Sequence, residues 1–183
     1  MNNKAFTLIE LLVVVLIIGV LSAIALPQYQ NAVLKTRVMA GLVPARAIMD
    51  AMDEYYLANG NFSGNWSNLT INLPAGATDE NGVALTSLPT SMDKYLYYGV
   101  GTGNKRHYRL QSNGKLQYQY YTNDRPVIIN LYSRYATSDA YKDLQGKVTC
   151  TYGSSSSTGK ESICKMLGAT KLSGTTSAGT YVF

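Results

Sequence analysis

Residues that carry out chemistry are scarce in this sequence. The 183 residues include one histidine, His107, and two cysteines, and only 15% are charged, against about 25% in an ordinary soluble domain. His107 follows Arg106 in a predicted strand rather than standing near a nucleophile, which favours a structural role. Two cysteines with no nearby histidine are too few ligands for a zinc site. We therefore predict that the chain is no enzyme and holds no metal or cofactor.

Charge of either sign is too sparse to identify a partner. Lys and Arg number 16 and Asp and Glu 11, a net charge of +5, which excludes a polybasic nucleic-acid coat and a disordered acidic tail. The 15 tyrosines, with Lys105, Arg106 and Arg109, would suit single-stranded nucleic acid. Packing of tyrosines in a sheet explains them better, so nucleic acid is kept as a minor alternative. The glycine-rich residues 99–103 lack the spacing of a phosphate-binding loop.

Hydrophobic residues, in contrast, are concentrated in one long run. Between Phe6 and Leu26, 17 of 21 residues are hydrophobic. A helix of that length measures about 31 Å, the thickness of a bilayer's hydrocarbon core. The run is apolar on every face, which excludes an amphipathic surface helix. Because Lys4 keeps the preceding end in the cytoplasm, we predict a membrane-inserted helix with everything after Leu26 exported.

One acidic residue interrupts this run. Glu10 places a carboxylate in an apolar helix at a cost of a few kcal/mol, and the sequence has no Lys, Arg or His between Phe6 and Gln28. Cleavage before Phe6 would create an amino group one turn from Glu10. In a staggered bundle of identical helices, Glu10 of one copy would meet the Phe6 amine of another. Such a head-to-tail contact generates a filament.

These residues resemble the N-terminus of type IV pilins and pseudopilins. The segment is Lys4-Ala5, then Phe6-Thr-Leu-Ile-Glu-Leu-Leu12, then Gly19, then Ala25-Leu-Pro-Gln-Tyr29. The resemblance implies cleavage between Ala5 and Phe6 by a prepilin peptidase, N-methylation of Phe6, and polymerisation by inner-membrane assembly machinery. Glu10 would set the stagger between copies. Family members usually have glycine where this chain has Ala5.

Three other interpretations stay open. Ala23-Ile-Ala25 fits the cleavage rule of a secretory signal peptide, which would leave a chain starting at Leu26, although Glu10 has no role in such a signal. Within the resembled family, a pseudopilin of a type II secretion system is the alternative to a pilus subunit. A membrane-anchored module that binds DNA or sugar would be monomeric and indifferent to Glu10.

Gly19 and Pro27 weaken the helix between them. Glycine costs about 1 kcal/mol in a helix, and Pro27 removes the hydrogen bond to the carbonyl of Ala23. In the resembled filaments this region is commonly unwound, which makes them extensible. We therefore predict that helical hydrogen bonding between Gly19 and Pro27 is lost on assembly.

Residues 28–59 are predicted to form an amphipathic helix. Its polar face has two bands of charge, basic Lys35 and Arg37 and acidic Asp50, Asp53 and Glu54. The bands lie about 22 Å apart along the helix, so staggered copies would pair them. A solvated helix face explains the same pattern equally well. Pro44 is predicted to kink the helix near Ala40.

The remaining residues predict a loop followed by an antiparallel sheet. Phe62 and Trp66 are expected to pin the loop to the helix. Asn113-Gly114 forms the turn of a hairpin, with Leu116, Tyr118 and Tyr120 on one face. The predicted strands are residues 95–100, 107–112, 115–121 and 127–132.

Cys150 and Cys164 are the only cysteines, and in an exported chain this favours a disulfide. The bond would close a loop through residues 153–159, and residues 161–167 are predicted to form a short helix. In type IV pilins a carboxyl-terminal disulfide loop forms an exposed edge. That edge is the best candidate here for contact with a partner.

The fold class is therefore α+β, a long N-terminal helix packed on an antiparallel sheet with a C-terminal disulfide loop, as in the pilin fold. We divide the chain into a leader at residues 1–5, a hydrophobic helix at 6–27, its amphipathic continuation at 28–59 and a globular head at 60–183. The resemblance places the precursor in the inner membrane and the homo-oligomeric filament in the periplasm or outside the cell.

Overall fold

The computed structural model describes residues 7–79, 81–90, 96–98, 106–121, 126–152, 161–171 and 180–183. The chain forms two compact units, residues 1–37 and 38–183, which are described separately below.

One helix, α1, runs from Leu8 to Asn59 and enters both units. It continues without a break through Gly41 and Pro44. Pro44 removes a single hydrogen bond, the one that its missing N–H would give to the carbonyl of Ala40. The helix ends where the sequence predicts, and a bond from the Gly60 N–H to the Tyr56 carbonyl (2.7 Å) closes its last turn.

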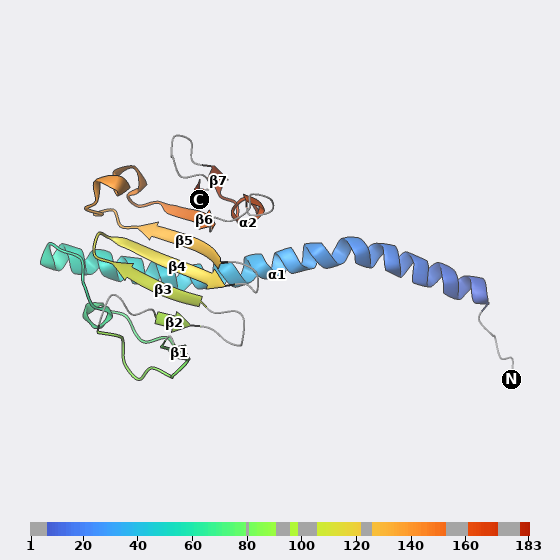
Figure 1. The fold of residues 1–183 in the computed structure, drawn as a ribbon, viewed down its shortest axis with the longest axis horizontal. Helices are drawn as coiled ribbons and strands as arrows, with labels where there is room; N and C mark the ends of the chain where they lie inside the picture. The colour runs from blue at the N-terminus through green and yellow to red at the C-terminus, as the bar shows by residue number, and fades with distance from the viewer. Residues whose placement is uncertain are drawn as a thin grey trace. The chain divides into compact units, whose positions relative to one another are not determined.

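The second unit contains an eight-stranded sheet in the order β1-β2-β3-β4-β5-β6-β8-β7, with every neighbouring pair antiparallel. Within this unit, α1 from Val38 onward lies against one face of the central strands (Figure 1). The strands are β1 (Ala77–Thr78), β2 (Leu96–Tyr98), β3 (Arg106–Gln111), β4 (Lys115–Tyr121), β5 (Pro126–Tyr132), β6 (Val148–Tyr152), β7 (Thr170–Lys171) and β8 (Tyr181–Val182).

The central hairpin forms as predicted, but its loop has three residues, 112–114, instead of the two of Asn113-Gly114, because Gln111 rather than Ser112 pairs with Lys115. Strands β3 and β4 pair Leu110 with Leu116 and Tyr108 with Tyr118, and Gly114 adopts a φ of 83° in the connecting turn. Alternation along β4 places Leu116, Tyr118 and Tyr120 on the face toward α1, where all three are buried. The α+β fold class and the hairpin predicted from the sequence are thus confirmed.

The core of this unit is built around the inner face of α1. Its buried helical residues are Val38, Gly41, Leu42, Ala45, Ile48, Met49, Ala51 and Met52. As predicted, the loop after α1 is pinned to the helix: Phe62 stacks on Tyr56 with 4.6 Å between ring centroids, and Trp66 is fully buried in the short helix η1 (Trp66–Asn68).

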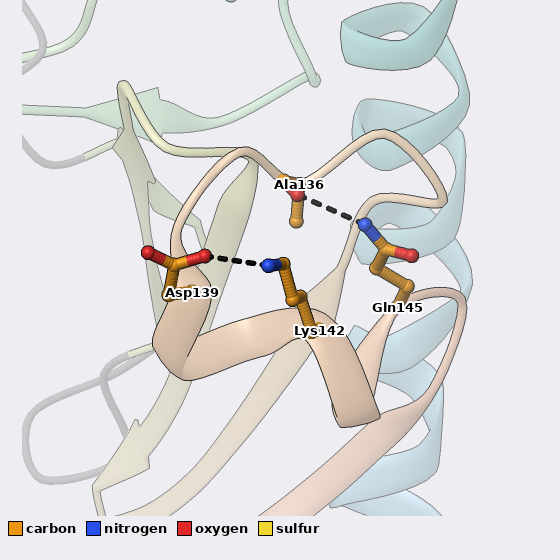
Figure 2. Close-up of polar contacts among 4 residues, drawn as sticks. All are labelled: Ala136, Asp139, Lys142 and Gln145. Atoms are coloured by element: carbon orange, nitrogen blue, oxygen red, sulfur yellow. Dashed lines mark hydrogen bonds and ion pairs between the residues drawn. The ribbon is translucent and has the colours of Figure 1, made fainter.

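Strands β1, β6, β7 and β8 and two short 3-10 helices were not predicted. The helix η2 (Asp139–Leu144) lies in the connection between β5 and β6, where Lys142 pairs with Asp139 at 2.8 Å (Figure 2). The Gln145 side chain donates a hydrogen bond of 3.0 Å to the Ala136 carbonyl in the same connection (Figure 2). The predicted short helix is α2 (Glu161–Met166).

Candidate functional site

Glu10 is held by Thr7 at the start of α1. The Thr7 N–H and Thr7 hydroxyl both donate to Oε2 of Glu10, at 2.8 Å and 2.7 Å, and the Glu10 N–H donates to the Thr7 hydroxyl at 3.3 Å. This reciprocal arrangement is a capping box, in which a threonine and a glutamate three residues later satisfy each other's backbone donors. The Thr-x-x-Glu spacing in the sequence is the signal for this capping box, which was not predicted.

The capping box does not neutralise Glu10. The two donors of Thr7 are a backbone N–H and a hydroxyl, and neither carries a charge. The carboxylate therefore keeps its negative charge, which the helix dipole favours at this end of α1. No ion pair of Glu10 occurs within the residues that the structure describes. Lys4, Ala5 and Phe6, the predicted processing residues, lie outside those residues. Glu10 is therefore bonded within its own chain and still available to a cation.

The helix around Glu10 presents an apolar surface on all sides. In the first unit, the large hydrophobic side chains from Leu8 to Leu26 are between 45% and 83% exposed. Among the described residues, α1 is a helix long enough and apolar enough to cross a membrane. A surface this apolar has to be covered by lipid or by other helices, because exposure to water costs about 25 cal/mol per Å².

Gly19 and Pro27 lie within helical residues of this unit. A methyl group added at Gly19 would meet no atom within 4 Å, so nothing in the subunit requires glycine there. The predicted loss of helical structure between Gly19 and Pro27 concerns the assembled state, and it stays a prediction.

The acidic band is engaged within the head. The Ser133 hydroxyl donates to Oδ1 of Asp53, and the Thr70 hydroxyl donates to Oε2 of Glu54 at 3.0 Å. Partial burial raises the pKa of Asp53, against the lowering effect of the Ser133 hydrogen bond. Lys35 and Arg37, the basic band, are exposed in the first unit. Pairing of the two bands between copies remains a prediction, and Asp50 and Glu54 are the exposed members of the acidic band.

The two described basic residues of the minor nucleic-acid alternative lie on opposite faces of one strand. Along β3, Arg106 shares the face of Tyr108 and Leu110, whereas Arg109 lies on the opposite face. The guanidinium of Arg106 lies over the ring of Tyr120 at 5.8 Å. Lys105 and the whole glycine-rich stretch, residues 99–103, lie outside the described residues. Because strand alternation separates the two arginines, they do not form one binding surface.

His107 is a buried residue of the outer sheet face. It is 4% exposed and packs beside the ring of Tyr121 at 5.2 Å. Burial lowers the pKa of His107 to about 4. Among the described residues there is no cluster of three His, Cys, Asp or Glu side chains that would hold a metal ion. The geometry agrees with the structural role that the sequence predicts.

Cys150 of β6 and Cys164 of α2 form the predicted disulfide, with their Cα atoms 5.8 Å apart. The bond links the sheet to the short helix that precedes β7. The predicted tip of the loop, residues 153–159, lies outside the described residues, so its role in partner contact is still a prediction.

Comparison with known families identifies the start of the chain. The family model described as the prokaryotic N-terminal methylation motif matches residues 1–26. The chain carries this methylation motif. The matched residues contain the capping box, the exposed apolar helix and the predicted cleavage position, so the resemblance recognised in the sequence is confirmed.

Curated relatives of the chain are fimbrial proteins and type IV pilins. A fimbrial protein of Neisseria meningitidis serogroup B is 44% identical over 63 residues, which cover 34% of this chain and 37% of the relative. A serogroup A fimbrial protein is 36% identical over 86 residues, 47% and 49% of the two chains. The type IV major pilin protein PilE1 of Neisseria gonorrhoeae is 41% identical over 63 residues, 34% and 38%. The chain thus spans between about a third and half of the length of these relatives.

Proposed function

We propose that the chain is the structural subunit of a type IV pilus. It would be inserted in the inner membrane as a prepilin, cleaved between Ala5 and Phe6 by a prepilin peptidase, methylated on Phe6, and polymerised by the membrane assembly machinery. The observation that carries the proposal is the position of the methylation motif. It coincides with an exposed apolar helix whose one acidic residue has no cationic partner among the described residues.

In this proposal Glu10 is the residue that recognises another copy. The two hydrogen bonds from Thr7 fill Oε2, and the other carboxylate oxygen can accept from the Phe6 amine of a neighbouring subunit. In lipid such a pair is much stronger than in water, because a lone charge there has no other partner. The chain itself would catalyse no reaction. A pilus subunit is favoured over a pseudopilin because the relatives are named as pilins and fimbrial proteins.

The proposal is tested with Glu10→Ala and the control Asp143→Ala, which removes an exposed acidic side chain of the head that lies outside the two predicted charge bands. Sheared surface fibres are examined by electron microscopy, and the N-terminus of the fibre protein is determined by mass spectrometry. We expect wild-type fibres whose protein begins with methylated Phe6. Fibres should be lost in Glu10→Ala, which still inserts in the membrane, and be retained in Asp143→Ala.

Two results would contradict the proposal. A mature wild-type protein that begins at Leu26 would show that the apolar run is a cleaved signal peptide. A monomeric wild-type protein that keeps Met1 would show a membrane anchor with a binding head.

A further inference from the structure

The first turns of α1 in the head contain two weak points. Gly41 costs about 1 kcal/mol relative to alanine, and Pro44 leaves the Ala40 carbonyl without its helical hydrogen bond. Nevertheless, this stretch is deeply buried, with Val38 and Ala45 fully inaccessible and Leu42 4% exposed. Something other than helix propensity has to hold it in helical form.

Two tyrosines from the sheet reach the backbone of α1 at this point. Tyr108 of β3 donates a hydrogen bond of 2.9 Å from its hydroxyl to the Gly41 carbonyl, and Tyr118 of β4 donates one of 3.2 Å to the Val38 carbonyl. Both side chains are fully buried. Their rings stack with 5.2 Å between centroids and 20° between planes, as expected for residues that are directly paired across the two strands.

Close approach of Tyr118 depends on glycine in the helix. A Cβ atom at Gly41 would overlap the hydroxyl and ring of Tyr118. Glycine therefore serves here as the gap through which a side chain contacts the helix backbone. Glycine lowers the helix propensity at position 41, and the hydrogen bonds from the hydroxyls of Tyr108 and Tyr118 offset that loss.

We infer that Tyr108 and Tyr118 form a clamp that stops unwinding of α1 at Val38. This inference rests on the proposed function, because a filament under tension pulls on α1 from its N-terminal side. The hydroxyl bonds are made to Val38 and Gly41, and the weak stretch from Gly19 to Pro27 precedes both residues along α1. An unwinding helix would be arrested where the tyrosine hydroxyls fix the carbonyls of Val38 and Gly41.

The clamp limits how far each subunit can lengthen. Unwinding a residue from helix to extended chain adds about 1.9 Å, the difference between rises of about 3.4 and 1.5 Å. Residues 19–37 would then supply about 36 Å per subunit, and residues 38–59 would supply about 42 Å more if the clamp failed.

The clamp is tested by amide hydrogen exchange on the full-length chain in detergent micelles. The double variant Tyr108→Phe/Tyr118→Phe removes both hydroxyls and keeps both rings. The control Tyr121→Phe removes a hydroxyl from the outer face of β4, where it donates to Gln119 at 3.0 Å. We expect the amides of Leu42 and Ala45 to exchange at least about tenfold faster in the double variant, since two hydrogen bonds of about 1 kcal/mol each are lost.

In the same variant the amides of β5 should accelerate less than those of Leu42 and Ala45, and Tyr121→Phe should leave α1 unchanged. An equal increase at every amide would show that the tyrosines only stabilise the core, and no increase at Leu42 and Ala45 would also overturn the inference. On filaments, the double variant should extend further under load than wild type. If the wild type forms no filaments, the proposed function fails, whereas the exchange experiment still decides whether the clamp exists.

Discussion

Replacing Gly41 by alanine sets helix propensity against packing. Alanine improves propensity by about 1 kcal/mol. Its methyl group, however, overlaps the buried ring of Tyr118, and overpacking in a core costs about 1 to 3 kcal/mol. Displacing Tyr118 also breaks its hydrogen bond to the Val38 carbonyl, for about 1 kcal/mol. We therefore expect Gly41→Ala to lower the free energy of unfolding of the head by about 1 to 3 kcal/mol.

The assay is chemical denaturation followed by the fluorescence of Trp66, the single tryptophan, which is fully buried in the head. Gly19→Ala is the matched control, because a methyl group there meets no atom within 4 Å and should leave head unfolding unchanged. In a Tyr118→Leu background, which vacates the space, most of the Gly41→Ala penalty should disappear. The reasoning is refuted if Gly41→Ala is as stable as wild type, or if its penalty is the same in both backgrounds.

Three further predictions concern the head. Burial lowers the pKa of His107 to about 4, against about 6.5 in the unfolded chain, so the free energy of unfolding should drop by on the order of 3 kcal/mol as the pH falls from 6.5 to 4. NMR titration of this single imidazole should show a midpoint near 4, and a midpoint near 6.5 would contradict the prediction. Replacing Cys150 and Cys164 by serine should cost about 3 kcal/mol of unfolding free energy, and equal urea midpoints for both proteins would be the contrary result. Because the pKa of Asp53 is raised in the folded protein, its contribution to stability is present at low pH and declines as the pH rises above about 4. In Asp53→Asn, whose side chain can still accept the hydrogen bond from the Ser133 hydroxyl, the urea midpoint should not show that decline.

The parts of the fold that were predictable depend on short-range signals. The apolar run and its amphipathic continuation identified α1 to its last residue, because helical periodicity repeats over many turns. Asn113-Gly114 located the hairpin, although the observed loop also includes Ser112 and the register is therefore one residue away from that of a two-residue turn. Strand β6 gave no such signal: it is five residues long, and its partners β5 and β8 are brought to it by long connections. Its pairing is a property of the tertiary structure.

In the candidate site and the head, too, some features could be predicted from the sequence and others could not. The bond between Thr7 and Glu10 could have been read from their spacing, and so could the separation of Arg106 and Arg109 to opposite faces of a strand. The role of Gly41 could not. A glycine in a helix looks like a defect until the tyrosine that occupies its empty side is known, and Tyr118 is 77 positions away in the sequence.

The strand order at the end of the sheet has a consequence for biogenesis. Strand β8 lies between β6 and β7, so β7 reaches the sheet only through residues 181 and 182. Under the proposed export, that edge stays open until residues 181 and 182 have crossed the membrane and paired with β6. A head in which this pairing has not yet formed would offer the open edge of β6 to proteases instead of a finished surface.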